Sequence, residues 1–234
     1  MSKNGPKPSV LGTLLMLTLI SGLVDAVSYL GLGRVFTANM TGNVVVLGFA
    51  AAGAPGFSVA ATLTSLGAFL LGALGAGLLT RRIMARSLLL TIAMGIEAVL
   101  GGVAATVAYL SVTVSSGAGR YTVIAVLAFA MGVRNATVRR LAVPDMTTTV
   151  LTMTLTGLAA DSRLAGGTGE GTIRRALAIA AMLIGAVAGA ALYLHQGAGP
   201  PLAVAAAAAA VTIIGFRLSS APQQLDAPRP AKRA

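Results

Sequence analysis

The chain contains 234 residues, of which 56% are hydrophobic and only 10% are charged. Because a soluble domain averages about 25% charged residues, this composition argues against both a water-soluble globule and a disordered chain. The formal net charge of +11 would suggest a nucleic-acid partner in a soluble protein. In so apolar a chain it is better explained by membrane orientation, so we expect no nucleic acid to bind.

The sequence has no Cys and a single His. These counts exclude a disulfide framework, a thiolate metal site and a cysteine nucleophile. The one histidine, His195, follows an apolar run beside Gln196, where a solvated interfacial position is the ordinary interpretation. We therefore expect no metal, no cofactor and no enzyme activity.

A bilayer core requires about 20 apolar residues per helix. Six apolar runs are long enough, and the first and third of them each contain one acid, Asp25 and Glu97. We expect transmembrane helices at 10–32, 58–80, 87–112, from 121 onward, 175–195 and 201–218. Residues 10–218 then form one transmembrane domain, preceded by a cytoplasmic tail at 1–9 and followed by a basic, disordered cytoplasmic tail at 219–234.

Two further apolar segments, 36–52 and 143–160, are too short or too polar to be evident spans. If neither crosses, both termini, the Arg81 cluster and the basic stretch at 134–175 fall on one side of the membrane. That asymmetry satisfies the positive-inside rule. It favours six spans in a bacterial inner membrane with both termini cytoplasmic; the alternative is eight crossings.

A weak internal repeat divides the chain into halves at about 10–112 and 118–218. Gly22-Leu-Val-Asp25-Ala26 is matched by Gly132-Val-Arg-Asn135-Ala136. Each is followed by an Asx-Met-Thr string, at Asn39 and at Asp145. Three spans per half would give the halves opposite orientations in the membrane, as in many transporters.

Each short segment resembles an extended approach followed by a half-helix, starting at Met40 or Met146, with Asn39 or Asp145 as the N-cap. Such backbone is tolerated at membrane depth only where it is buried in protein or lines a watery cavity. Both helix N-termini would point inward and gather N–H groups there. Asp145 makes proton or cation coupling as plausible as anion binding. We expect the central site to be lined by Asn39, Thr41, Asn43, Asp145, Thr147 and Thr149, unless these residues serve only as caps and local hydrogen-bonding groups.

Intramembrane charges mark a second group of candidates, Asp25, Glu97 and Arg134, because each is costly in lipid. Arg134 follows Arg120 too closely for a full span to separate them, so we place Arg134 and Asn135 within the fourth helix. We expect Arg134 to pair with Glu97, with Asp25 nearer the outer side. Functional and purely structural roles remain equally open for these charges.

These strings resemble the YoaK family of bacterial multi-pass membrane proteins, most specifically Ala38-Asn39-Met40-Thr41-Gly42-Asn43. The resemblance covers nearly the whole chain. It implies an integral inner-membrane protein and supplies no substrate.

The sequence therefore predicts an all-α polytopic protein with six transmembrane helices and two re-entrant or broken half-helices. We expect a transporter or channel for a small polar or ionic solute; the alternative is a non-transporting scaffold or regulatory subunit. Small residues at four-residue spacing, at Gly185/Gly189 and Ala68/Gly72/Ala76, indicate close helix packing within or between protomers. A homo-oligomer in the lipid bilayer is compatible with such faces.

Overall fold

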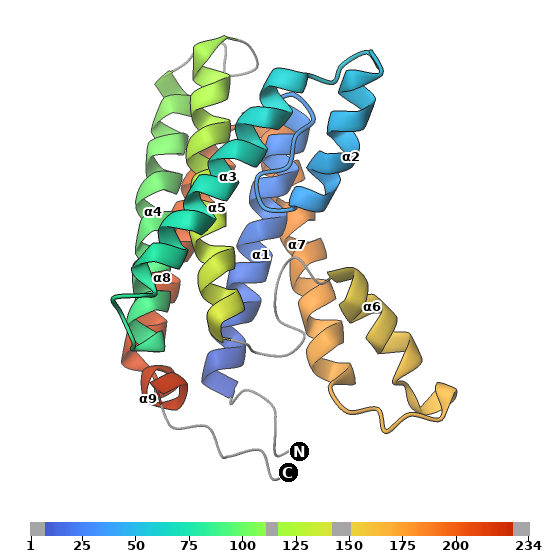
Figure 1. Cartoon of the computed structure of the whole chain (residues 1–234), viewed down its shortest axis with the longest axis vertical. Coiled ribbons are helices and arrows are strands. Elements are labelled where there is room, and N and C mark those ends of the chain that lie inside the picture. The colour runs from blue at the N-terminus through green and yellow to red at the C-terminus, as the bar shows by residue number, and fades with distance from the viewer. Residues whose placement is uncertain (1–7, 111–116, 142–150, 227–234) are drawn as a thin grey trace.

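The computed structural model describes residues 8–110, 117–141 and 151–226, and within these ranges the regular structure is entirely helical (Figure 1). Six helices are long, two are short and apolar, and a 3-10 turn (Arg163–Ala165) and a small terminal helix complete the described elements. The elements are α1 (Pro8–Gly31), α2 (Met40–Ala51), α3 (Val59–Leu79), α4 (Arg86–Leu110), α5 (Ala118–Leu141), α6 (Leu151–Ala160), α7 (Thr172–Gln196), α8 (Gly199–Leu218) and α9 (Ala221–Asp226).

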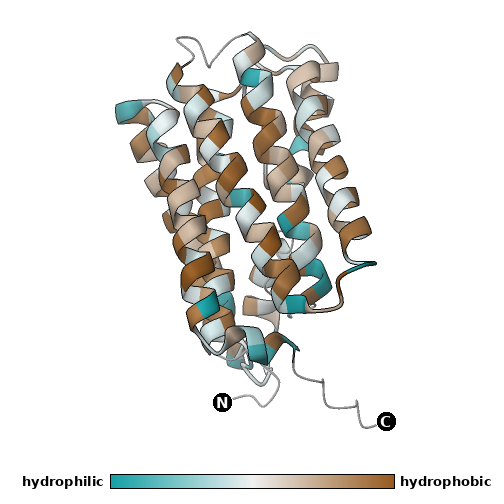
Figure 2. Ribbon diagram, turned by 90° about the vertical axis from the view of Figure 1, so that its left-hand side faces the viewer, coloured by the Kyte–Doolittle hydropathy of each residue, from teal (hydrophilic) through white to brown (hydrophobic). Residues whose placement is uncertain are grey.

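The six long helices are long and apolar enough to cross a membrane, which confirms the prediction of six spans. Helix α2 has 12 residues and α6 has 10. At 1.5 Å per residue these reach about 18 and about 15 Å, roughly half of a bilayer core of about 30 Å. The described parts of both short helices are therefore about half as long as a full crossing requires. Figure 2 shows apolar residues along the lengths of the helices, with hydrophilic residues gathered mostly near the lower end of the bundle.

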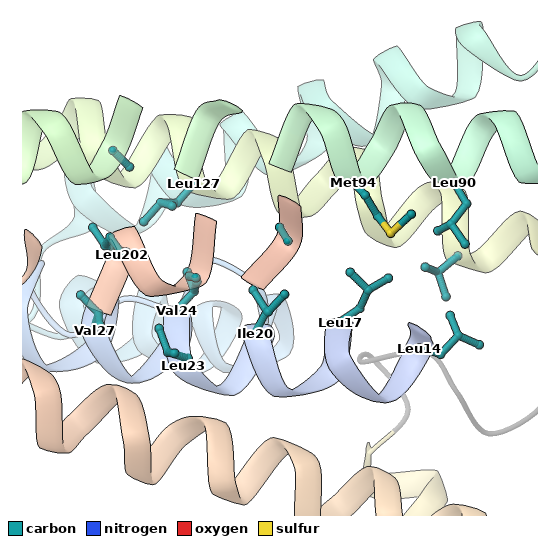
Figure 3. Close-up of a cluster of buried hydrophobic side chains, with 14 of the residues drawn as sticks. Leu14, Leu17, Ile20, Leu23, Val24, Val27, Leu90, Met94, Leu127 and Leu202 are labelled. Atoms are coloured by element: carbon teal, nitrogen blue, oxygen red, sulfur yellow. The ribbon is translucent and has the colours of Figure 1, made fainter. Parts of the chain in front are cut away.

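Helices α1 and α5 form the centre of the bundle, being the two most buried of the long helices. Helix α1 carries apolar residues on all sides, the pattern of a helix that is surrounded by others. Its side chains Leu14, Ile20 and Leu23 are almost fully buried, and they belong to a cluster that includes residues of α4, α5 and α8 (Figure 3). The candidate residues on α1 and α5 are consequently held in protein rather than in lipid.

The two halves of the chain are related by an inverted repeat of helix crossings. Helix α1 packs against α7, and α5, the counterpart of α1, packs against α3, the counterpart of α7. In the first crossing a Cβ on Gly22 would overlap the Met182 carbonyl oxygen. In the second crossing a Cβ on Gly132, which is the counterpart of Gly22, would overlap the Phe69 carbonyl oxygen. Figure 1 shows α1 and α5 running in opposite directions, as the inverted orientation requires.

The small-residue stripes lie in these crossings. A Cβ on Gly185 would overlap the Leu19 carbonyl, and one on Gly72 would overlap that of Phe129. Without a side chain at these positions the helix backbones approach closely enough for extensive dispersion contact, which drives helix association in lipid. The predicted packing role is confirmed within one protomer, whereas an oligomeric role remains a prediction.

Helix α9 packs against α4 and α1, in contrast to the disordered tail that the sequence predicts from residue 219 onward. Ala221 and Leu225 are buried, and Asp226 Oδ1 accepts a hydrogen bond from the Ser87 backbone N–H at 3.1 Å. Asp226 Oδ2 also accepts from the Ser87 hydroxyl. The Asp226 carboxylate therefore acts as a cap for the start of α4, because its negative charge lies at the positive end of that helix dipole.

This contact makes stability depend on pH. Burial raises the pKa of Asp226, but the hydrogen bonds from Ser87 and the Arg86 backbone, with the charge on Arg86, hold it below the ordinary value of 3.8. The stabilisation is present above that value and is lost as the pH falls through the lower folded-state value. We expect Asp226→Asn to lower stability by about 1 kcal/mol or less at neutral pH, as for other caps. Thermal unfolding of the detergent-solubilised protein measures this, and an equal difference between variant and parent at strongly acid pH would contradict it.

Candidate functional site

The centre of the bundle contains a buried ion pair. Arg134 Nη1 lies 2.7 Å from Glu97 Oε1, and the two residues are only 1% and 3% exposed. Arg134 Nη1 also donates to the Leu17 carbonyl oxygen at 3.1 Å, and Nη2 donates to the Ser21 hydroxyl. The predicted pairing of Arg134 with Glu97 is confirmed, and it ties α1, α4 and α5 together.

Asp25 holds the segment that leads into α2, residues 32–39, here called the lead-in segment. Its Oδ1 accepts hydrogen bonds from the backbone N–H groups of Thr37 at 2.9 Å and Ala38 at 2.8 Å. The carboxylate thus lies at the positive end of the α2 dipole. Asn39 occupies the predicted N-cap position, but its side chain makes no capping hydrogen bond. The expected capping hydrogen bond is therefore absent, and Asp25 binds the N–H groups of the two residues before the cap rather than those of the first helical turn.

Asn43 fixes the same lead-in segment from the other side. Its Nδ2 donates to the Phe36 carbonyl oxygen at 2.7 Å and to Ser65 Oγ at 3.0 Å, while its Oδ1 accepts from the Phe36 N–H at 2.8 Å. Asn43 is fully buried and does not line either of the cavities described below. The geometry gives this predicted site residue a structural function, which is to close the lead-in segment on itself and against α3.

A cavity of about 280 Å³ lies where the first turns of α2 and α6 meet. Asn39, Thr41 and Gly42 line it from α2 and its cap, and Leu151 and Thr152 line it from α6. The structure thus brings the first turn of α2 and the first described residues of α6 to one cavity. Thr152 was not among the predicted site residues, although the threonine-rich run at 147–152 was the signal for it.

A second cavity, of about 310 Å³, adjoins the first and reaches Asp25. Asn39 and Met182 line both cavities, so the two spaces share a boundary between the lead-in segment and α7. The other lining residues are mostly small or apolar, and Tyr29 stacks on Phe36 with 4.9 Å between ring centroids. Met182 carries no polar signal, which is why sequence reasoning missed it.

Asn135 reaches the site from the second half. Its Nδ2 lies 3.5 Å from the Ala38 carbonyl oxygen, and the Ala38 N–H donates to Asp25. Because Asn135 is the repeat counterpart of Asp25, the two halves meet at Ala38. The predicted site residues Asp145, Thr147 and Thr149, and the predicted helix start at Met146, lie outside the described residues.

The arrangement provides polar groups within an apolar bundle. Within residues 8–110, 117–141 and 151–226, no three His, Cys, Asp or Glu side chains group together to hold a metal ion. His195 lies in the last turn of α7 and lines neither cavity. The site can bind and orient a solute through hydroxyl, amide and backbone groups.

The fold and site together define a polytopic α-helical membrane protein built from two inverted halves around a polar centre. Residues 13–215 match the family described as "Protein of unknown function (DUF1275)", and the chain belongs to that family. It is 34% identical over 150 residues to the "UPF0700 transmembrane protein YoaK" of Bacillus subtilis (strain 168), a match that covers 62% of this chain. The match spans 64% of that relative's length, slightly less than two thirds. No solved structure matches the chain.

Proposed function

We propose that this protein transports a small polar or ionic solute across the membrane through a site at the starts of α2 and α6. The observation that carries the proposal is the cavity lined by the first turns of both short helices, one from each inverted half. Non-helical backbone within a bilayer is costly unless it is buried or lines a watery space. A cavity beside the lead-in segment satisfies this condition, because its non-helical backbone then borders a space that can hold water.

Charge supports one orientation for this transporter. Arg81, Arg82 and Arg86 lie between α3 and α4 or at the start of α4, and Arg139 and Arg140 end α5. These helix ends lie at the same end of the bundle (Figure 1). The positive-inside rule supports a cytoplasmic location for that end, and the proposal includes cytoplasmic termini and a bacterial inner membrane. The proposed protein has no enzyme activity. Its partners are the lipid bilayer and the transported solute, and it can assemble as a homo-oligomer.

Thiol labelling tests the proposal, because the chain lacks cysteine. Thr41→Cys and Thr152→Cys place single thiols on the cavity, and a charged, membrane-impermeant reagent should label both in liposomes, from at least one side. Leu71→Cys is the matched control, since Leu71 is 62% exposed in the middle of α3, where it faces lipid. A thiol in hydrocarbon does not ionise and should stay unlabelled.

Protection of the Thr41→Cys and Thr152→Cys proteins from both sides, at the level of the Leu71→Cys control, would contradict a water-accessible path. That result would favour the scaffold or regulatory subunit. Such a protein needs the glycine crossings but has no use for a cavity at the α2 and α6 starts.

A further inference from the structure

The charges inside the bundle do not cancel completely. Glu97 and Arg134 neutralise each other, and the Arg134 guanidinium is bound to Glu97, the Leu17 carbonyl and Ser21. Asp25 is the other acid within the described spans, only 5% exposed, and it makes no ion pair with any described residue. A buried carboxylate without a paired cation is costly in a membrane and marks a functional site.

One oxygen of Asp25 remains unused. Oδ1 accepts the Thr37 and Ala38 N–H groups of the lead-in segment, whereas Oδ2 is buried and has no hydrogen-bond partner among the described residues. Asp25 also lines the cavity of about 310 Å³ between α1, the lead-in segment and α7. An unsatisfied buried oxygen next to a cavity is a binding position for a group that has a positive charge or a hydrogen to donate.

The lining of this cavity decides which cation fits. Metal cations such as Ca²⁺ and Mg²⁺ require about six or more oxygen ligands. Besides Asp25, the polar residues that line the cavity are Asn39 and Tyr29, and the remaining lining is apolar or glycine. A proton needs a single oxygen, which Asp25 supplies, whereas a metal ion would have to take most of its ligands from water.

We propose that Asp25 is the proton-binding residue of this transporter and that proton uptake there releases the lead-in segment of α2. The inference rests on the proposed transport function and assigns its coupling ion. Hydrogen bonds to an ionised acceptor are about twice as strong as those between neutral groups. A carboxylate also stabilises the α2 N-terminus through the helix dipole. Protonation removes both effects, so the segment that bears Asn39 and leads to Thr41 is held less firmly.

The surroundings of Asp25 contain few other groups that could produce this response. From α5, Arg134 acts on Asp25 electrostatically. From α4, Glu97 binds that same arginine through Oε1, while its Oε2 has no hydrogen-bond partner among the described residues. The lead-in segment contributes backbone N–H groups, and α7 contributes Met182, Ala186 and Ala190, none of which titrates. Asp25 is the acid that accepts hydrogen bonds from the lead-in segment among the described residues, so the pH response of that segment is assigned to it.

The labelling rate of Thr41→Cys in liposomes tests this proposal, with protons and a charged thiol reagent as the probes. Asp25→Asn mimics the protonated residue, and comparison at a single pH cancels the reactivity of the thiol itself. At about pH 8 the Asp25→Asn protein should label faster than its parent by a factor within the usual range of coupling, about 5- to 150-fold. At about pH 5 the two rates should converge as Asp25 takes up its proton.

Two variants complete the design. Glu170→Gln removes an exposed acid in the α6–α7 connection and should label as the parent does at both pH values. Asp25→Glu retains the carboxylate and should retain a pH-dependent rate. If Asp25→Asn does not fold, the parent's rate is normalised to that of glutathione in the same buffer, and the expected result is a rise as the pH falls.

The outcomes separate the two proposals. Equal labelling of the parent and Asp25→Asn at about pH 8 would overturn proton binding at Asp25 and leave the water-accessible path intact. A pH-independent normalised rate of the parent would do the same. No labelling of the thiol at position 41 in any variant, from either side, would overturn the proposed transport function and the coupling with it.

Discussion

Arg134→Gln should be among the most damaging single substitutions in this protein. It leaves Glu97 buried at 3% exposure without its ionic partner, and it removes the donors to the Leu17 carbonyl and to Ser21. Breaking a buried pair by removal of one member costs about 3–5 kcal/mol. The free energy of unfolding in detergent or bicelles should fall by that amount, and the protein yield from membranes should fall with it.

The double variant Arg134→Gln/Glu97→Gln provides the internal test. Because neither charge then remains unpaired, it should be more stable than the sum of the two single losses by about 0.5–3 kcal/mol. Arg139→Gln, an exposed arginine near the end of the same helix, is the matched control and should change stability by less than about 0.5 kcal/mol. Purely additive single effects would show that the pair does not act as a unit.

The spans were predictable because membrane helices obey two strong constraints, length and absence of charge. The first span was expected at 10–32 and α1 runs from Pro8 to Gly31, and the last was expected at 201–218 and α8 runs from Gly199 to Leu218. The expected start of α2 at Met40 is also correct. Here the signal was local, since an Asx residue precedes an apolar run too short to cross.

Scarcity of charge made the ion pair predictable as well. A buried arginine in a bundle needs an acid, and Glu97 was one of two candidates. The contacts of Asp25 and Asn43 were not predictable in the same way. Asp25 binds N–H groups 12 and 13 residues later, and Asn43 binds backbone seven residues earlier, and neither choice follows from helical periodicity. Both depend on how the lead-in segment turns back against α1.

The apolar part of the site escaped prediction for a different reason. Met182 borders both cavities, yet its side chain is ordinary in a transmembrane helix and its position follows only from the crossing at Gly22. The folding back of α9 onto α4 likewise depends on a contact between Asp226 and Ser87, 139 residues apart. Such long-range contacts leave no periodic signal in one sequence.

Gly72→Ala should destabilise the protein whereas Gly75→Ala on the same helix should not. A Cβ on Gly72 would overlap the Phe129 carbonyl oxygen, a backbone atom that cannot move without shifting α5, but a Cβ on Gly75 would meet nothing within 4 Å. Overpacking of this kind costs about 1–3 kcal/mol. Glycine to alanine at an open helical position is instead neutral or stabilising by up to about 1 kcal/mol. Thermal unfolding in detergent should therefore give shifts of opposite sign or clearly different size.

Pairs of these substitutions test the inverted architecture itself. Gly72 and Gly132 lie in the same α3–α5 crossing, so once one alanine has separated the helices the second should cost less, and the double variant should be non-additive. Gly72 and Gly185 lie in the two different crossings, and their effects should add within about 0.3–0.5 kcal/mol. Equal behaviour of the Gly72/Gly132 and Gly72/Gly185 pairs would contradict two separate glycine crossings. Non-additive effects for Gly72/Gly132 together with additive effects for Gly72/Gly185 would show that the α3–α5 and α1–α7 crossings are independent contacts. The two crossings would then be equivalent contacts on either side of the shared centre at Asp25 and Asn135.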